Sequence, residues 1–526
     1  MKGNWKFLFM SIIGLFIIGL SYGQANDDQA AIDEQVTNLE QNVETSKQVM
    51  SELEQEETVE DVITAEPIGE HSKEAVEEEG HNSHGHEGMN TLDLIALLVL
   101  LAALFTFINI HYIKLPGTIG LMLQALFLSL AIVGAGFIFP SIREGAENIM
   151  RNVDFTEVLL NIMLSFLLYA GALHVDIDKL KEESASVVVL AIFGTLMSTF
   201  LIATAIYYFL GLFELGFEIE YIHCLLLGAL ISPTDPIAVL AILKTTNISK
   251  NLQIKIEGES LFNDGIGVVV FITILAIASG GSSHGGGEEV TAGSVAFLFG
   301  KEVFGGLLLG GVFGAFGYWL LVVIDNAHEE LEVLTTLALV LVGTQIAVHL
   351  HISAPLAMVV MGLIVGRGNS TAGQLDENGV EIEGIAGEYV MKFWHLVDEA
   401  MNAILFILIG LEMLIIIEES TGAFLQIGVI SIFIILAGRF LGVAIPVTIL
   451  DFFKRSATGT IPILTWGGLR GGISIALALS LSNADLGGEV DGKQIKYLIV
   501  TITYCVVVFS ILVQGMTIEK LVKKYL

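Results

Sequence analysis

The sequence predicts an all-α polytopic membrane protein with about thirteen transmembrane helices. Of its 526 residues, 54% are hydrophobic and only 15% are charged, which is too apolar for an ordinary soluble domain. Apolar runs of about twenty residues, the length that crosses a bilayer, recur along most of the chain. Two of these runs contain prolines or glycines that interrupt a helix, so we also expect discontinuous helices. We expect membrane lipid as a partner and no nucleic acid.

The first 23 residues have the layout of a secretory signal peptide. Lys2 and Lys6 precede an apolar run from Phe7 to Leu20, and small or polar residues follow as far as Gly23. This order of a basic, an apolar and a cleavable part predicts a signal peptide at 1–23. An uncleaved membrane anchor is the alternative, and in both cases the following segment lies outside the cytoplasm.

Residues 24–90 form an acidic segment without any Phe, Trp or Tyr. Its nineteen Asp or Glu residues accompany only Lys47 and Lys73, and they account for about half of the net charge of −33. Such a segment buries too little apolar surface to offset the entropy of ordering, so we expect it to be disordered and extracytoplasmic. Its histidines are weak candidate ligands for Zn²⁺ or Cu²⁺, and a solvated linker is the simpler alternative. They are His71, His81, His84 and His86.

Thirteen apolar segments follow from residue 91 onward. They lie at about 91–113, 117–139, 155–176, 186–211, 220–243, 255–279, 302–325, 331–350, 353–366, 392–416, 423–450, 460–482 and 495–515. An odd number of spans after an external amino terminus puts the carboxyl terminus in the cytoplasm. Lysines and arginines support this orientation, because they concentrate in the loops that it places inside. The signal peptide and the short loops predict a multi-pass protein of a bacterial inner membrane.

Two of the thirteen segments are interrupted. The segment at 220–243 contains Pro233 and Pro236, and each proline removes a backbone donor and clashes with the preceding turn. The segment at 460–482 contains the glycine-rich stretch Gly467–Gly472, which predicts a similar break. Broken helices at corresponding positions of two halves point to the binding site of a transporter. Because the two segments are seven apart, they fit the geometry of an inverted repeat.

The segment at 255–279 carries four polar or acidic residues in an otherwise apolar run. Glu259, Ser260, Asn263 and Asp264 are one, three and four residues apart, so they share one flank of a helix. A charged side chain at the centre of a bilayer costs about 3 kcal/mol even on the mildest scale, and it normally marks an ion pathway. We take Asp264 as the functional centre.

Five ionisable residues are expected deep in the membrane. They are Asp235, Glu259, Asp264, Arg439 and Arg470. The arginines stay protonated and need acceptors, and Glu259 is the natural partner for one of them. With three acids and two fixed cations, at least one carboxylate is free to change its charge by binding a proton or a metal cation. The broken segment beside Asp264 offers backbone carbonyls and the Thr234 hydroxyl as oxygen ligands for an alkali cation.

Two other functions fit part of this pattern. An intramembrane aspartyl protease would use Asp235 and Asp264 as a catalytic dyad. Two prolines beside the first acid, Asn263 beside the second and two buried arginines count against that chemistry. A metal-sensing membrane protein would use the histidines of the acidic segment, but nothing in the membrane part requires it.

Three more polar residues lie in or near the segment at 392–416. They are Asp398, Asn402 and Glu412. We expect interface, supporting or helix-packing roles for these residues before direct binding. Cys224 and Cys505 lie in predicted spans and form neither a disulfide framework nor a metal-site spacing.

Three motifs together resemble the signature segments of a known transporter family. They are SPTDPIAVLAIL at Ser232–Leu243, GESLFNDGIGVVV at Gly258–Val270 and WGGLRGGISIALALSL at Trp466–Leu481. In this order they closely resemble the monovalent cation/proton antiporter 1 family, the sodium/proton exchangers, over roughly residues 91–526. The resemblance implies a secondary active antiporter that exchanges Na⁺, or alternatively Li⁺ or K⁺, for H⁺ by alternating access. It implies no enzymatic activity and no cofactor.

The resemblance also implies roles for residues at matching positions of this sequence. The implied ion- and proton-binding group comprises Thr234, Asp235, Ser260, Asn263 and Asp264. Within this group, the Na⁺ ligands would be Asp264, Ser260 and Thr234. The implied structural ion pair consists of Glu259 and Arg439, with Arg470 as a further cation.

The resemblance further implies a homodimer with two domains in each protomer. The core domain would contain the helices at about 186–279 and 423–515, and the dimerisation domain those at about 91–176 and 302–416. Electroneutral one-for-one exchange is implied because electrogenic relatives carry an aspartate at the position of Asn263. Ala170 stands where many relatives carry an acid, so the outer-shell role of that acid in their pH response is not carried over to this sequence.

Overall fold

The structure is a computed structural model of the whole chain. It describes residues 91–136, 139, 163–213, 215–235, 250–279, 292–324, 328–367, 387–419, 422–452, 459–488 and 491–525. The chain divides into two units, Met1–Leu92 and Asp93–Leu526, and the fold described below is that of the second unit. The predicted signal peptide, the acidic segment and its four histidines lie outside the described residues.

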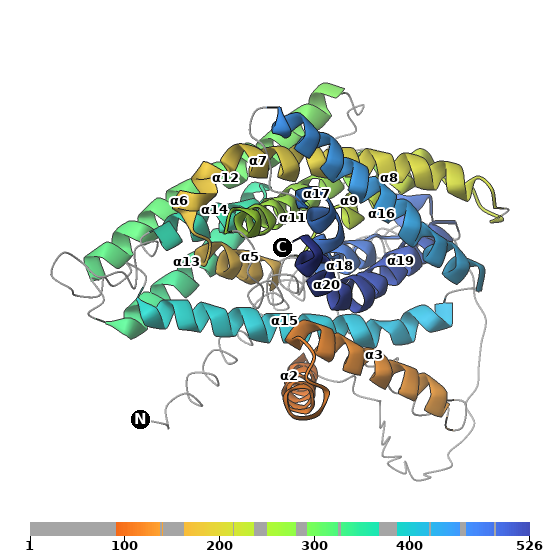
Figure 1. Cartoon of the computed structure of the whole chain (residues 1–526), viewed down its shortest axis with the longest axis horizontal. Helices are drawn as coiled ribbons and strands as arrows, with labels where there is room; N and C mark the ends of the chain where they lie inside the picture. Colours follow the sequence, from red (N-terminus) through yellow and green to blue (C-terminus); the bar gives the residue numbers. More distant parts are fainter. Residues whose placement is uncertain are drawn as a thin grey trace, which may run out of the picture. The chain divides into compact units, whose positions relative to one another are not determined.

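The described part of the chain up to Ala278 is helical in most of its length (Figure 1). Its helices are α2 (Thr91–Ile108) with the π-helical turn η1 (Asn109–Ile113), α3 (Gly117–Gly136), α5 (Leu164–Leu173), α6 (Ile177–Glu182), α7 (Ser184–Val189) with η3 (Leu190–Gly194), α8 (Thr195–Leu210), α9 (Tyr221–Ile231) and α11 (Lys250–Ala278). The second half comprises α12 (Ala292–Ile324), α13 (Glu329–Leu350), α14 (Ala354–Gly366), α15 (Glu388–Glu419), α16 (Gly422–Asp451), α17 (Thr460–Gly467), α18 (Gly472–Leu479), η6 (Ala484–Leu486), α19 (Asp491–Phe509), η7 (Ser510–Gln514) and α20 (Gly515–Tyr525).

The prediction of a helical membrane protein is confirmed. In the described part of the chain, nine helices are long and apolar enough to cross a membrane, and α5, α9 and α14 are shorter apolar helices. Each of the thirteen predicted segments contains at least one helix. The number thirteen stays a prediction, because the segments at 155–176 and 220–243 run partly through residues that the structure does not describe.

Some helices extend beyond the predicted segments. Helix α12 begins at Ala292 rather than near 302, and α15 begins at Glu388 rather than near 392. The last span continues through η7 into α20, as far as Tyr525. The extensions of α15 and of the last span carry charged residues, whereas residues 292–300 at the start of α12 are mostly apolar. Helix α20, for example, buries Ile518 and Val522 on one face and carries Lys523 and Lys524 in its last turn. A search for apolar runs therefore ends before the helix does.

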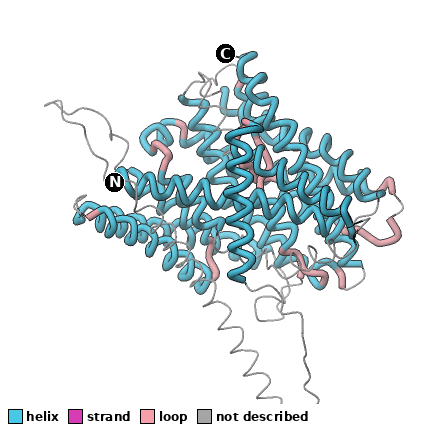
Figure 2. Tube along the Cα trace, turned by 90° about the horizontal axis from the view of Figure 1, so that it is seen from below, coloured by secondary structure: helices cyan, strands magenta, loops and turns pink. Residues whose placement is uncertain are grey.

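The helices pack in two groups. In the first group α3 packs on α15, α5 on α14, and α14 on α12 and α13. In the second group α8 packs on α9, α16 on α8 and α19, and α11 on α9. The groups meet where α11 contacts α12 and α14 and where α15 contacts α18. Figure 2 shows non-helical segments in the interior of this assembly as well as at its edges.

Aromatic packing fixes α15 within the first group. The buried Trp394 of α15 makes an edge contact with Tyr169 of α5, with ring centroids 4.6 Å apart. Its indole Nε1 donates a hydrogen bond to Thr336 Oγ1 of α13, over 3.0 Å. A buried indole with a satisfied N–H holds three helices at one point. The position of α15 matters because α15 forms one wall of the cavity described below.

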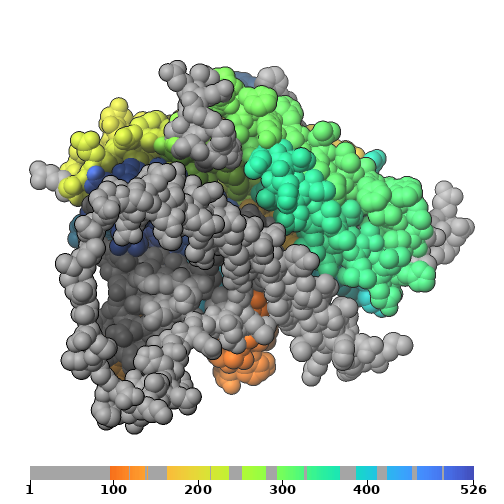
Figure 3. All heavy atoms as spheres, turned by 180° about the vertical axis from the view of Figure 1, so that it is seen from behind, coloured from red at the N-terminus to blue at the C-terminus, as the bar shows by residue number. Residues whose placement is uncertain are grey.

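The outer surface of α12 is apolar. Large exposed side chains follow its length, and the green region of Figure 3 shows this part of the molecule. They are Phe297, Phe304, Leu308, Val312, Phe316 and Trp319. A continuous surface of this kind is suited to lipid or to another apolar protein surface rather than to water.

Candidate functional site

Two interrupted helices cross at the centre of the second packing group. Helix α9 ends at Ile231, and Ser232 to Asp235 are not helical. Helix α17 ends at Gly467 and α18 begins at Gly472. The amide of Asp235 donates a hydrogen bond to the carbonyl of Leu469 over 2.8 Å, and the two residues form an antiparallel bridge. Both predicted breaks are present, although Pro236 and the rest of its segment lie outside the described residues.

Glycines allow the non-helical segments at the crossing to pack closely against each other and against α11. A Cβ atom on Gly471 would lie 2.5 Å from Oδ2 of Asp235. A Cβ atom on Gly267 of α11 would lie 2.1 Å from Cγ of Pro233. No side chain fits at such distances, so these positions permit close contact between α11, the end of α9 and the start of α18.

Helix α11 brings its polar residues to this crossing. The amide of Thr234 donates to Asn263 Oδ1 over 3.3 Å, and Asn263 Nδ2 donates to Thr234 Oγ1 over 2.8 Å. The hydroxyls of Thr234 and Ser260 lie 3.2 Å apart. All three side chains are buried. They form a hydrogen-bonded layer that joins the open end of α9 to the middle of α11.

Glu259 forms a two-bond ion pair with Arg439 of α16. Arg439 Nη1 donates to Glu259 Oε1 over 2.8 Å, and Nη2 donates to Oε2 over 3.0 Å. Arg439 Nη2 also donates to the carbonyl of Leu464, and Asn263 Nδ2 donates to Glu259 Oε1. Both charged side chains are nearly inaccessible to solvent. Two parallel bonds satisfy this carboxylate, which therefore acts as an anchor within the site.

Arg470 lies in the extended stretch between α17 and α18. Its backbone amide donates to Ser510 Oγ over 2.8 Å, and its side-chain Nη1 donates to the carbonyl of Gly468 over 3.1 Å. The side chain is buried, and its electrostatic neighbours include Arg439, Glu259 and Asp264. Arg470 thus adds a second fixed positive charge behind the acidic residues.

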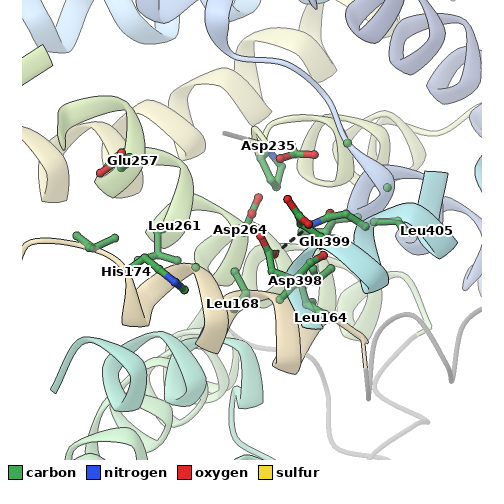
Figure 4. Close-up of a pocket in the computed structure, with 18 of the residues that line it drawn as sticks. Leu164, Leu168, His174, Asp235, Glu257, Leu261, Asp264, Asp398, Glu399 and Leu405 are labelled. Carbon is green, nitrogen blue, oxygen red and sulfur yellow. Dashed lines mark hydrogen bonds between the residues drawn. The ribbon is translucent and has the colours of Figure 1, made fainter. Parts of the chain in front are cut away.

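A cavity of about 570 Å³ opens in front of this layer. Its walls come from α5, the end of α9, α11, α15 and the start of α18. Asp264 is only 5% exposed but lines the cavity together with Asp235. Figure 4 shows Asp264 and Asp235 near the centre of this space, with Asp398 close by and His174 and Glu257 farther out.

The structure separates the predicted site residues into two sets. Asp264 and Asp235 line the cavity, whereas the lining residues do not include Thr234, Ser260 or Asn263. The latter three are hydrogen-bonded to one another, and Asn263, which precedes Asp264 in the sequence, also bonds Glu259 of the ion pair.

Several residues of the cavity wall were missed by the sequence analysis. They are His174, Asp176, Glu257, His395 and Glu399. They lie at the end of α5, at the start of α6, on α11 and on α15, so no local pattern joins them. Asp398 and Asn402 also line the cavity, although we expected interface or packing roles for them. Ala170 is fully buried in α5 and is not part of the wall.

No metal-ion cluster is present in the described part of the chain. No three His, Cys, Asp or Glu side chains there are arranged to hold a metal ion, and Cys224 and Cys505 are free thiols. The four histidines of the acidic segment lie outside this part.

Comparison with known proteins places this site in a family. Residues 96–524 match the model of the family described as "Sodium/hydrogen exchanger, transmembrane". The chain belongs to the sodium/hydrogen exchanger family. This exchanger is 43% identical over 443 residues to the Na⁺/H⁺ antiporter NhaP of Pseudomonas aeruginosa, covering 82% of this chain and 96% of that one. It is 32% identical over 435 residues to the Na⁺/H⁺ antiporter NhaH of Halobacillus aidingensis, with 82% and 97% covered.

A solved structure has the same fold as this exchanger. The sodium proton antiporter MjNhaP1 from Methanocaldococcus jannaschii, determined at pH 8, superposes with a TM-score of 0.63 at 19% identity. The match covers 82% of this exchanger and 98% of MjNhaP1. The predicted antiporter fold is therefore confirmed. Members of this family are transporters rather than enzymes, so neither a protease nor a metal sensor is supported.

Proposed function

We infer that this chain exchanges Na⁺ for H⁺ across the membrane by alternating access, and that Asp264 binds the two ions in turn. The observation that carries this inference is the position of Asp264. Asp264 lines a cavity together with Asp235 and Gly471 of the two broken helices, and it directly follows Asn263 of the buried hydrogen-bonded layer. Broken helices at a buried acidic residue supply the oxygen ligands that a dehydrated alkali cation needs.

The charges around Asp264 explain why this carboxylate exchanges its ligand. Both oxygens of Glu259 are bound by Arg439, so this carboxylate is already occupied. Asp235 lies beside Gly471 at the amino end of α18, where the helix dipole favours a negative charge. Of these three acids, Asp264 is the one that both lines the cavity and lies in the middle of a transmembrane helix. Moving it between the two sides of the membrane requires neutralisation, by either Na⁺ or H⁺.

The proposed exchange is electroneutral, with one Na⁺ for one H⁺ on a single carboxylate. Asp264, Ser260 and Thr234 are the proposed Na⁺ ligands, with Asn263 and Asp235 in supporting positions. Na⁺ is favoured because curated relatives with high coverage are named Na⁺/H⁺ antiporters. Li⁺ and K⁺ accept the same oxygen ligands and are tested alongside it.

The proposed assembly is a homodimer in a bacterial inner membrane, with a cytoplasmic carboxyl terminus. The two packing groups support a division into a core and a dimerisation domain, since α11 and α16 belong to one group and α12 and α15 to the other. The exposed apolar side chains of α12 provide a surface that a second protomer or lipid can cover.

The test is proton movement in inside-out membrane vesicles that have an acid interior. A pH-sensitive dye follows the lumen while NaCl, LiCl or KCl is added. We expect cation-dependent alkalinisation with wild-type protein and none with Asp264→Asn. The matched control is Asp178→Asn, which removes an aspartate from α6 whose side chain is 62% exposed and pairs with Lys181. Equal activity of wild type and Asp264→Asn would overturn the assignment, and no response to any cation would overturn the exchange itself.

A further inference from the structure

One turn of α15 presents an acid and an amide to the same cavity as Asp264. Asp398 and Asn402 both line this space, and they are four residues apart on the helix. Helix α15 belongs to the first packing group, whereas α11 belongs to the second. Figure 4 shows Asp398 near Asp264 but on a different helix. The cavity therefore has polar oxygen atoms on two walls that belong to different parts of the molecule.

The orientation of the Asn402 amide is fixed by its hydrogen bonds. Asn402 Nδ2 donates to the backbone carbonyl of Asp398 over 2.8 Å and to Asp398 Oδ1 over 3.0 Å. Because both partners are acceptors, the atom between them must be the amide nitrogen, and the other atom must be Oδ1. Asn402 is 3% exposed, and its Oδ1 is buried without a hydrogen-bond partner among the described residues. A buried acceptor in the wall of a polar cavity is a position where a donor or a cation is expected.

The charges that line the cavity favour a cation, rather than a neutral donor, as the partner of Asn402 Oδ1. Six carboxylates line it, and they are Asp176, Asp235, Glu257, Asp264, Asp398 and Glu399. Lys179 is the lysine among the lining residues, and its ammonium group is paired with Asp176. A narrow space lined by one sign of charge raises the local concentration of ions of the other sign.

We propose that Asp398 and Asn402 form a second site, which holds a hydrated monovalent cation on the α15 wall before it reaches Asp264. The Asp398 carboxylate and the Asn402 carbonyl are hard oxygen ligands, and water completes the coordination shell. The site rests on the proposed function, since its cation is the one that is exchanged. It supplies cations to Asp264 without itself crossing between the two sides.

A supply site of this kind changes affinity more than turnover. Asp398→Asn keeps the shape of the side chain and the acceptor for Asn402, but it removes the charge that faces the cation. We expect the apparent KM for Na⁺ to rise about threefold to tenfold, as for the loss of one partly solvated ionic contact, with a maximal rate within about twofold of wild type. Asn402→Leu, which removes the carbonyl at similar volume, is expected to change the KM in the same direction.

The matched control is Glu388→Gln. It removes the same charge from the same helix, but its side chain is 75% exposed and is not among the residues that line the cavity. We expect its KM to stay within about twofold of wild type. An equal rise of the KM in Asp398→Asn and Glu388→Gln would mean a general field effect and would overturn the second site. A lower maximal rate with an unchanged KM in Asp398→Asn would mean a structural role and would also overturn it.

A binding measurement separates this proposal from the exchange function. Purified Asp264→Asn protein is titrated with NaCl and followed by the line width of the ²³Na NMR signal, after its folding is checked by size-exclusion chromatography. We expect weak saturable binding that is lost in the Asp264→Asn/Asp398→Asn double variant. The same titration curve for both variants contradicts the second site. If wild-type vesicles show no exchange while the Asp264→Asn protein still binds Na⁺ through Asp398, the proposed function fails and the binding site stands.

Discussion

The guanidinium group of Arg439 binds both carboxylate oxygens of Glu259, at 2.8 and 3.0 Å, inside the membrane part of the protein. The same Glu259 also accepts a hydrogen bond from Asn263, which lies next to Asp264 in the sequence. The buried ion pair is therefore bonded to the residue that immediately precedes Asp264, the proposed ion-binding residue. It fixes the amide of Asn263, which also bonds Thr234 at the open end of α9.

Removing one partner of this pair should destabilise the protein strongly. Arg439→Ala leaves an uncompensated buried carboxylate, and such changes cost about 3–5 kcal/mol. We expect a large drop in the thermal stability of the purified protein, measured by the loss of its monodisperse size-exclusion peak after heating. Lys392→Ala is the control, because its pair with Glu388 has side chains that are 55% and 75% exposed. Such an exposed pair is worth about 0–1 kcal/mol. Equal melting of both variants would contradict an anchoring role of Arg439.

Gly471 should tolerate no side chain. The Cβ atom of an alanine at this position would lie 2.5 Å from Asp235 Oδ2 and 2.7 Å from Asp235 Cβ, so the crossing would have to shift. Overpacking of this kind costs about 1–3 kcal/mol, and a shift at the site should lower the exchange rate about tenfold or more. Dye-based exchange rates, normalised to protein amount, provide the measurement. Gly311→Ala in α12 is the control, since no atom lies within 4 Å of its added Cβ, and it should exchange like wild type.

An aspartate at position 263 should disable this protein rather than make it electrogenic. The Asn263 amide donates to Glu259 Oε1 over 2.9 Å and to Thr234 Oγ1 over 2.8 Å. In Asn263→Asp, a second carboxylate would replace a donor directly beside the first, and two close like charges repel. We expect exchange to fall to the level of the Asp264→Asn vesicles, with lower thermal stability. Retained exchange that responds to a valinomycin-imposed potential would show that the layer adapts to the extra charge.

Proton and cation should compete in the pH dependence of exchange. If both bind Asp264, a lower pH fills the site with protons, and the apparent KM for Na⁺ rises. In the acid range, where the proton dominates, the rise approaches about tenfold for each pH unit, because one proton displaces one cation. Initial rates at a series of NaCl concentrations and pH values give this slope. A maximal rate that falls with pH at constant KM would exclude competition at one carboxylate.

The sequence was informative where the determinants are local. Apolar runs located the helices, and the spacing of Glu259, Ser260, Asn263 and Asp264 on a single helix predicted their common flank. The prolines and glycines of the two interrupted segments predicted both breaks, since each acts on its own backbone. Their pairing through Asp235 and Leu469 could not be predicted, because it depends on how two distant segments pack.

The cavity could not be predicted from the sequence either, because it too depends on how distant segments pack. Asp398 and Asn402 occur in an apolar helix without any motif, and only the packing of α15 next to α18 brings them to Asp264. Our expectation of an interface or packing role followed from their flanking positions alone. The helix end at Tyr525 was also missed, because α20 is too polar to extend an apolar run.

The bond between Asp235 and Leu469 joins main-chain atoms only. Neither side chain takes part in it, so this one bond does not depend on which side chain stands at position 235. The same residue thus has two separable parts: a main chain that ties the two broken helices together, and a carboxylate that is presented to the cavity.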